Sequence, residues 1–365
     1  MTDIMQLADY NFEVGPIRPP SEGGSNSLLL RATRNCPWNR CKFCYGFPYN
    51  REKFELRSVD EIKGDIDTVK AIVEGIKEAS LRLGYGGAIN GSVGTAIVRS
   101  DPSLNSNHSF ALVFSWLSVG AKTVFLQDAN SLIMRTPDLL GVLRYLKETF
   151  PTIERVTSYA RAQTIGKKPL DELKELRSAG LSRLHVGLET GDDEVLTYVD
   201  KGVTSEEQIE AGKKAKEAGF ELSQYVMTDL GGRRMSDQHA RNTARVLNET
   251  NPDFIRMRPF VLGPGLPLYE DYESGALELS SPHERLRELR TFIENLDVTS
   301  RVCFDHFLNS WYTDSGRRHT LFKQDYNGYK FPEEKADVLR LIDEGLEVDE
   351  SMHIHVKELI GLANL

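Results

Sequence analysis

A phrase that recurs along the chain constrains its fold most: a helical segment, a glycine, an apolar strand and then a polar residue. It occurs in SVGAKTVFLQD (118–128), SAGLSRLHVGLE (178–189) and EAGFELSQYVMTD (217–229). In each segment the glycine stands where a helix needs a left-handed residue in order to end. Strands that alternate with helices predict a parallel sheet. The sequence therefore predicts an α/β protein.

Six strands are expected in all. Besides the three above, LLLRAT (28–33), ERVTSY (154–159) and DFIRMR (253–258) are short runs of strand length. Six units of strand and helix suit a partial (β/α)6 TIM-like barrel better than a closed eight-stranded one. Helical segments follow near 283–296 and 333–362, so additional C-terminal helices are expected.

Capping boxes, in which Ser or Thr is followed three residues later by Glu, mark two helix starts. Ser58 with Glu61 opens a long helix whose isoleucines and valines recur at helical spacing, and Thr204 with Glu207 opens another. By contrast, residues 84–109 are rich in Gly, Ser and Asn and lack any periodicity. That composition predicts an inserted loop.

These patterns divide the chain into three expected parts. Pro and Gly interrupt any periodicity at 15–27, so residues 1–27 are interpreted as an N-terminal extension. The barrel is expected at 28–275, with the inserted loop inside it. A helical C-terminal region is expected at 276–365.

Three of the four cysteines lie within nine positions, in the stretch RATRNCPWNRCKFCYGF. Cys36, Cys41 and Cys44 have the spacing Cys-x4-Cys-x2-Cys, and three thiolates from one tight loop can hold one face of an iron–sulfur cluster. Three ligands would leave a fourth iron without a protein ligand, as catalytic metal sites keep one position open. The cations of the same loop are expected to favour thiolates and to offset the cluster's charge; they are Arg34, Arg40 and Lys42.

Other uses of the thiols stay open at this point. A zinc site would want a fourth ligand nearby, and the loop contains no His. A two-iron cluster of the plant-ferredoxin kind would need a later cysteine, and the only one is Cys303, far along the chain. Inert structural thiols are a third reading.

The net charge of the chain limits the partners that it is expected to bind. Lys and Arg number 45 against 54 Asp and Glu, a net charge of −9, which argues against a nucleic-acid partner. The N-terminal residues lack the basic start and apolar run of a secretory signal, and no segment is apolar for long enough to span a bilayer. A cytoplasmic protein without a membrane association is expected.

With the cysteine loop and the strand–helix repeats in hand, residues 28–270 resemble the radical S-adenosylmethionine (radical SAM) superfamily. The resemblance is strongest to its Elongator, methylthiotransferase and coproporphyrinogen-oxidase-like branch. The segments LHVGLETGDDEVLTYVDKG (184–202) and FVLGPGLPLYE (260–270) are similar to its fourth-strand and sixth-strand segments, and Phe43 fills the aromatic place before the last cysteine. Two departures stand out: the family's common spacing is Cys-x3-Cys-x2-Cys, and LQDANS (126–131) replaces its Gly-Gly-Glu.

The resemblance implies a 4Fe-4S cluster on the three loop cysteines, with S-adenosylmethionine (SAM) bound through its amino and carboxylate groups to the fourth iron. It also implies reductive cleavage of SAM to a 5′-deoxyadenosyl radical, in an oxygen-sensitive enzyme. The candidate cosubstrate residues are Arg161 for the carboxylate, Asp128 or Asn130 for the ammonium, Glu189 for the ribose, Ser158 as a polar residue of a strand end, and Phe43, Tyr225 and Met227 for the adenine.

The substrate is not readable from the sequence, and a small organic molecule is the preferred expectation. Cys303 as a hydrogen-atom donor, and Asp305 and His306 as acid–base groups, are candidate catalytic residues. A reductant such as flavodoxin or ferredoxin is the expected protein partner. Two alternatives remain: a non-catalytic cluster protein that carries electrons or chaperones heme or another cofactor, and a radical SAM enzyme that modifies RNA or a peptide.

Overall fold

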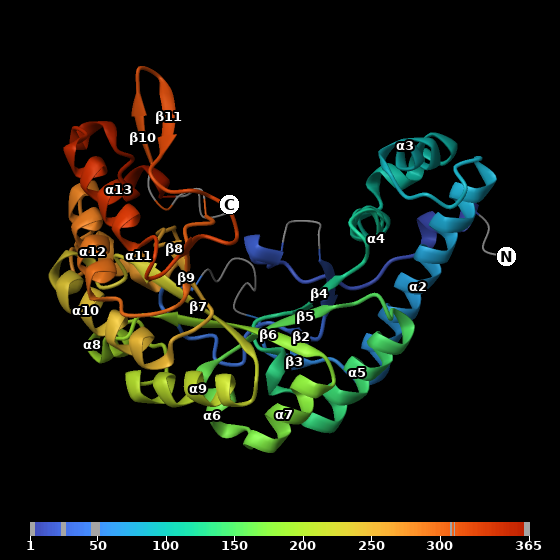
Figure 1. Ribbon diagram of the computed structural model, residues 1–365, viewed down its shortest axis with the longest axis horizontal. Helices are drawn as coiled ribbons and strands as arrows, with labels where there is room; N and C mark the ends of the chain where they lie inside the picture. Colours follow the sequence, from blue (N-terminus) through green and yellow to red (C-terminus); the bar gives the residue numbers. More distant parts are fainter. Residues whose placement is uncertain (1–3, 23–26, 45–51, 307–308, 310, 361–365) are drawn as a thin grey trace. The chain divides into compact units, whose positions relative to one another are not determined.

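The computed structural model of the chain (Figure 1) describes residues 4–22, 27–44, 52–306, 309 and 311–360. The chain divides into two compact units, and each is built from several segments. The first unit comprises residues 1–35, 54–159 and 174–183. The second comprises residues 36–53, 160–173 and 184–365.

The first unit contains a parallel sheet whose strands lie in the order β1-β4-β5. Each strand pairs with its neighbour in parallel, and the strands are buried apolar runs, as expected for a parallel sheet covered on both faces. Two shorter strands pair with each other in antiparallel fashion. The strands are β1 (Leu28–Arg31), β4 (Thr123–Gln127), β5 (Arg155–Ala160), β2 (Thr33–Arg34) and β3 (Glu55–Leu56).

The helix α2 (Val59–Arg82) is the longest of this unit, and the predicted capping box of Ser58 and Glu61 opens it. Its isoleucines and valines are buried, and it packs against α4 and α5. The remaining helices here are α3 (Gly91–Ser100), α4 (His108–Ser118), α5 (Thr136–Thr149), α7 (Leu170–Ser178, which begins in the second unit), and the 3-10 turns η1 (Ile4–Asp9), η2 (Pro20–Glu22), η3 (Pro102–Ser106) and η4 (Ser131–Ile133).

The prediction that residues 84–109 form a loop is wrong, because α3 and η3 lie within them. Asn90 caps α3 by accepting a hydrogen bond from the Val93 amide, and Val93 and Ile97, one helical turn apart, are buried. A Cβ at Gly94 would lie 2.8 Å from the Phe114 ring, so this glycine serves close packing rather than flexibility. Whether the segment is an insertion stays a prediction.

The second unit carries strands in the order β6-β7-β8-β9-β12. β7 with β8 and β8 with β9 pair in parallel, whereas β12 is antiparallel to β9. Neither β9 nor the exposed β10–β11 hairpin was predicted from sequence. The strands are β6 (Leu181–Glu189, which begins in the first unit), β7 (Glu221–Thr228), β8 (Phe254–Pro259), β9 (Arg301–Cys303), β10 (Trp311–Asp314), β11 (Arg317–Thr320) and β12 (Tyr329–Lys330).

Helices α9, α10, α12 and α13 of the second unit pack one against the next (Figure 1). The predicted capping box of Thr204 and Glu207 opens α9. The predicted helix at 333–362 is too long, since α13 ends at Glu347 and short 3-10 turns follow. The helices are α6 (Ala162–Lys167), α8 (Asp193–Tyr198), α9 (Ser205–Glu217), α10 (Gly232–Thr250), α11 (Pro267–Glu273), α12 (Pro282–Asn295), α13 (Lys335–Glu347), η5 (Glu350–Met352) and η6 (Val356–Leu359).

The six expected strands are all present as β1, β4, β5, β6, β7 and β8, and helices separate them along the chain. The predicted α/β class, with the strand–helix repeats of a partial (β/α)6 barrel, is confirmed. The three-part domain division stays a prediction. No helix in the described ranges has both the length and the apolar character that a bilayer crossing requires.

Candidate functional site

The cysteine loop, residues 36–44, is fastened to the turn that follows α8. The amide of Lys42 donates to the carbonyl of Val199 at 2.9 Å, and the indole N–H of Trp38 donates to the carbonyl of Asp200 at 2.6 Å. These bonds hold the loop by its backbone and by one large side chain. The positions of its thiols therefore depend on the conformation of residues 198–202.

The three loop thiols act on one another electrostatically. Burial raises the pKa of Cys41, while Lys201 and Arg161 oppose the rise. Burial, followed by the charges of Cys41 and Cys36, raises the pKa of Cys44 to about 12. The thiols therefore lie in one partly buried site with Lys201 and Arg161, and a bound metal would have to displace the protons of Cys41 and Cys44.

The cations that act on the thiols are not the ones expected from the sequence. The three basic side chains of the loop pair with carboxylates: Arg34 with Glu13, Arg40 with Asp200, and Lys42 with Asp271. Lys201 and Arg161, which lie far from the loop in sequence, provide the positive charge instead.

Glu189 and Lys201 form an ion pair of 2.9 Å beside these thiols. Glu189 follows the apolar run of β6 in a left-handed conformation, φ 64°. A Cβ at Gly187 would overlap the Glu189 carboxylate, so the glycine of the GLE sequence makes room for this side chain. The Lys201 ammonium also lies 5.5 Å from the centre of the Phe43 ring.

Arg161 enters the same site from the residue before α6. Its Nη2 donates to the carbonyl of Lys201 at 2.8 Å, and its guanidinium carbon lies 5.2 Å from the centre of the Trp38 indole. The structure thus brings together Arg161, Glu189 and the cysteine loop, and adds Lys201, which sequence reasoning missed.

The three residues predicted to contact adenine are all buried. Phe43 and Met227 belong to one apolar cluster together with Cys41. Tyr225 lies on the same face of β7 as Met227, two residues away, and its ring is 4.5 Å from the Arg258 guanidinium. The unit therefore offers an apolar wall next to the thiols.

Three further candidates, Asp128, Asn130 and Ser158, belong to the first unit and are buried there. Arg31 donates to one oxygen of the Asp128 carboxylate through two N–H groups, at 2.7 and 2.9 Å. Burial raises the pKa of Asp128, and this arginine opposes the rise. The Ser158 hydroxyl donates to the carbonyl of Tyr159.

Cys303 is fully buried on β9 and is surrounded differently from the loop cysteines. Burial raises its pKa to about 12, and the charged groups that act on it are Arg256, Arg258, Asp305 and Asp325. Its thiol donates to the carbonyl of Tyr326. None of these groups is among those acting on Cys41 or Cys44, which argues against Cys303 as a fourth cluster ligand.

Asp305 bridges two arginines, with Arg256 at 2.7 Å on one oxygen and Arg258 at 2.8 Å on the other. Burial would raise the pKa of this carboxyl, but the two guanidinium groups outweigh burial and lower it. Asp305 therefore remains ionised at neutral pH and is suited to holding arginines, not to proton transfer. Burial lowers the pKa of His306 to about 4, so its ring is neutral at physiological pH.

A buried acid pair was not predicted. Asp229 follows β7, and its amide donates to the Glu288 carboxylate at 2.6 Å. The Asp229 carboxylate in turn accepts a hydrogen bond from the Ser280 hydroxyl. Burial, then the charge of Glu288, raises the pKa of Asp229 to about 7; burial likewise raises the pKa of Glu288 to about 7. The two carboxyls are therefore partly protonated near neutrality, and Arg285 lies close to both of them.

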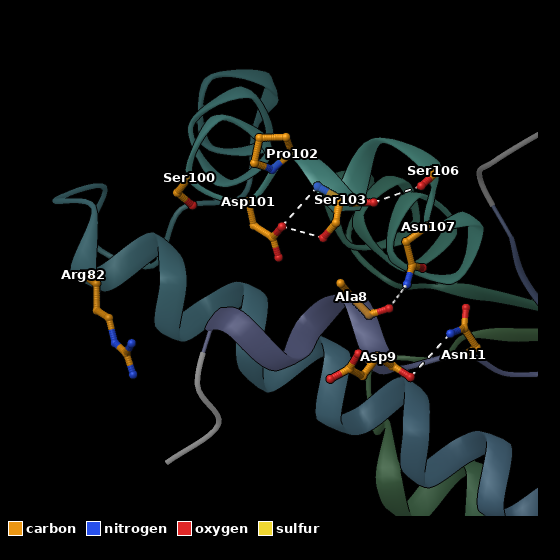
Figure 2. Close-up of a pocket in the computed structure, with 10 residues that line it drawn as sticks. All are labelled: Ala8, Asp9, Asn11, Arg82, Ser100, Asp101, Pro102, Ser103, Ser106 and Asn107. Carbon is orange, nitrogen blue, oxygen red and sulfur yellow. Dashed lines mark hydrogen bonds between the residues drawn. The ribbon is translucent and has the colours of Figure 1, made fainter.

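A polar pocket of about 830 Å³ in the first unit (Figure 2) contains none of the predicted site residues. It lies between the end of η1, the end of α2 and the turn around η3. Asn107 crosses it to donate to the carbonyl of Ala8, and Asp101 caps η3. Its polar groups serve local structure, so the chemistry of this chain is sought at the cysteine loop.

The chemistry of the donors at the loop fits an iron–sulfur cluster. Three thiols from one short segment, in a partly buried site with cations nearby, are the donors that such a cluster uses.

The missed residues left weak signals in the sequence. Lys201 lies near the end of the 184–202 segment whose resemblance was noted, but nothing in the spacing shows that a turn returns it to Glu189. Trp38 lies within the cysteine loop, where a tryptophan could equally pack in the core. Only the fold brings Lys201, Trp38 and Arg161 together.

Comparison with known proteins adds an independent finding. Residues 116–247 match the radical SAM superfamily. The tRNA uridine(34) acetyltransferase of Methanocaldococcus jannaschii is 26% identical over 116 residues, which cover 32% of this chain and 21% of that protein. The heme chaperone HemW of Bacillus subtilis is 22% identical over 170 residues, covering 46% of this chain and 44% of that protein.

The chain thus spans less than half the length of either curated relative. Among solved structures, the archaeal Methanocaldococcus infernus Elp3 is similar with a TM-score of 0.43 and 14% identity. The similarity covers 62% of this chain and 55% of that one.

Proposed function

We propose that the chain is a radical SAM enzyme, which holds a 4Fe-4S cluster on Cys36, Cys41 and Cys44 and cleaves SAM reductively. The observation that carries the proposal is the position of Lys201, whose charge acts on Cys41 and Cys44 and whose ammonium lies 5.5 Å from the centre of the Phe43 ring, with Arg161 acting on Cys41 as well. When bound and reduced by an external one-electron donor, the cluster would supply one electron to the sulfonium of SAM, so that the S–C5′ bond would break into methionine and a 5′-deoxyadenosyl radical that would take a hydrogen atom from the substrate.

The residues around the loop have complementary tasks in this proposal. Arg161 and Lys201 provide the positive charge for the SAM carboxylate, and a guanidinium offers it a two-pronged hydrogen bond. Glu189, held by Lys201, accepts hydrogen bonds from the ribose hydroxyls. Phe43 and Met227 form the apolar surface for the adenine and exclude water, with Tyr225 beside them.

For the ammonium group of SAM, Asn130 becomes the preferred candidate over Asp128. The Arg31 guanidinium already binds the Asp128 carboxylate, and its charge would repel an ammonium. The amide oxygen of Asn130 carries no ionic charge and can accept a hydrogen bond from an ammonium. Ser158 stays a candidate polar contact.

The substrate that we propose is a small organic molecule, because the net charge of −9 disfavours polyanions. A one-electron donor such as flavodoxin or ferredoxin would supply the reductant. RNA is the second candidate, because one relative bears the name of a tRNA-modifying enzyme. The candidate catalytic residues Cys303 and Asp305 are better suited to structural roles, and His306 is available only as a neutral ring.

The test is anaerobic reconstitution of the full chain with iron and sulfide, followed by dithionite and SAM. Formation of 5′-deoxyadenosine, measured by liquid chromatography, is expected from the wild type and from Cys303→Ala. A cluster whose spectrum ignores SAM, with no 5′-deoxyadenosine formed, would overturn the proposal. That result would favour a non-catalytic carrier or chaperone, since one relative bears the name of the heme chaperone HemW.

A further inference from the structure

Trp38 contacts two arginines from different parts of the chain. The guanidinium carbon of Arg40 lies 4.8 Å from the centre of its indole, and that of Arg161 lies 5.2 Å away. A guanidinium over an indole face is attracted by the negative charge of the ring's π-electrons. The indole therefore links the cysteine loop to Arg161, which reaches the site from the residue before α6.

The position of the indole is fixed by backbone groups. Its N–H donates to the carbonyl of Asp200 at 2.6 Å. Gly202 has φ 69°, and a Cβ there would overlap the six-membered ring of Trp38. The turn at 200–202 thus leaves a recess, which exists because residue 202 has no side chain. Trp38 fills this recess.

The unusual length of the cysteine loop is what accommodates Trp38. Four residues separate Cys36 from Cys41, and Asn39, directly after Trp38, adopts a left-handed conformation with φ 51°. Asparagine tolerates this region better than most residues. The left-handed residue turns the chain between Trp38 and Cys41.

We propose that Trp38 is a positioning residue that acts through Arg161. Its indole holds the guanidinium in the orientation that receives the SAM carboxylate. The inference deepens the proposed function and rests on it, because the ligand of Arg161 is the cosubstrate of that function. A long arginine side chain loses rotamer freedom when it binds, and an indole that already orients it lowers that loss.

SAM affinity is the direct readout. Equilibrium dialysis of SAM against the anaerobically reconstituted full chain gives the Kd for the wild type, Trp38→Phe and Trp38→Leu. Trp38→Leu is expected to weaken binding about tenfold, the equivalent of losing one partly buried cation–π contact. Trp38→Phe keeps an aromatic face and is expected to lie between the two. Iron content and the unfolding midpoint are measured on every variant.

Trp116→Phe is the matched control. Trp116 is buried in the first unit, donates to the carbonyl of Thr123 at 2.9 Å and packs edge-on against Phe150. Its replacement removes a more deeply buried indole that also donates to a backbone carbonyl, without touching the cysteine loop. The Kd for SAM is expected to stay at the wild-type value.

A double-mutant cycle separates positioning from general structural damage. If Trp38 acts through Arg161, then Trp38→Leu has no further effect on the Kd in an Arg161→Met background. An equal tenfold loss in both backgrounds would overturn the proposal, as would wild-type affinity in Trp38→Leu. If Trp38→Leu loses its iron, Trp38→Phe decides: weakened SAM binding with full iron supports the inference, and unchanged binding overturns it.

Failure of the proposed function gives a different result. A reconstituted wild type that does not bind SAM overturns that function, and the inference falls with it. If the wild type and Trp38→Leu bind SAM with the same Kd, only the role of Trp38 is overturned.

Discussion

The cysteine loop and the segment around Asp305 both gather thiol, acidic and basic side chains, but their charges are balanced in different ways. Asp305 binds two arginines at 2.7 and 2.8 Å, and its pKa falls below the ordinary value. At the loop, burial raises the pKa of Cys41 and Cys44, and the nearby cations only oppose that rise.

This difference separates a structural cluster from a binding site. Around Asp305 the charged groups stabilise one another, and a ligand would have to break strong ion pairs. At the loop, the thiols gain negative charge only when a metal replaces their protons. Cys303, Asp305 and His306 are reactive residue types that lie close together in sequence. Their proximity is therefore weaker evidence for chemistry than a set of groups, such as the loop thiols, that would be stabilised by a bound ligand.

The largest contrast is expected from removing one thiol in each region. Cys41→Ala should reduce bound iron and sulfide after anaerobic reconstitution to near background and abolish 5′-deoxyadenosine formation, because a cluster would keep only two protein ligands. Cys303→Ala should retain both. The comparison fails if Cys303→Ala loses the cluster or Cys41→Ala keeps it.

Asp305→Asn should cost about 3–5 kcal/mol of unfolding free energy, because it leaves the buried Arg256 without its counter-charge. Urea denaturation followed by circular dichroism measures this cost. The control Asp237→Asn breaks an exposed ion pair with Arg241 and should cost under about 1 kcal/mol. Similar costs for the two variants would contradict a structural role for Asp305.

Lys201→Met should weaken SAM binding about 10- to 100-fold, since a buried hydrogen bond to a charged group is worth about 1.5–3 kcal/mol. Lys201→Arg should recover most of the affinity. Lys213→Met, which removes an exposed pair with Glu249, should leave the affinity unchanged. Wild-type affinity in Lys201→Met, measured by equilibrium dialysis, would remove Lys201 from the site.

The acid pair of Asp229 and Glu288, which has no counterpart at the cysteine loop, should make stability depend on pH. Because burial raises both pKa values to about 7, the folded chain keeps a proton that the unfolded chain has lost above about pH 4. Stability should therefore fall as pH rises between about 4 and 7, by about 1.4 kcal/mol per pH unit for each proton that the folded pair retains, and level off above.

Glu288→Gln tests this pH dependence, because the amide cannot ionise. Urea unfolding at several pH values should give a flatter profile than the wild type between pH 5 and 7. A wild-type slope that persists in the variant would assign the titration to other groups.

Much of the fold follows from local patterns. The six strands and the two capping boxes appear where the sequence predicts them, because apolar runs and side-chain caps act over a few residues. The prediction of a loop at 84–109 was wrong for a related reason. Its glycines suggest a loop, yet Gly94 packs against Phe114, a contact with a residue twenty positions away that composition does not reveal.

The site was only partly predictable for the same physical reason. The cysteine spacing is local, so the cluster ligands could be proposed from the sequence. The ion pair of Glu189 and Lys201 depends on the turn after α8, and the contact of Trp38 with Arg161 joins segments 123 positions apart. Such contacts arise from tertiary structure, and no sequence period encodes them.

The cluster on Cys36, Cys41 and Cys44 is tested by Mössbauer spectroscopy of the anaerobically reconstituted, iron-57-labelled chain, with and without SAM. We expect a four-iron cluster in which one iron changes its signal when SAM is added, because three thiolates leave that iron open. A two-iron spectrum, or a four-iron spectrum that SAM leaves unchanged, would contradict it.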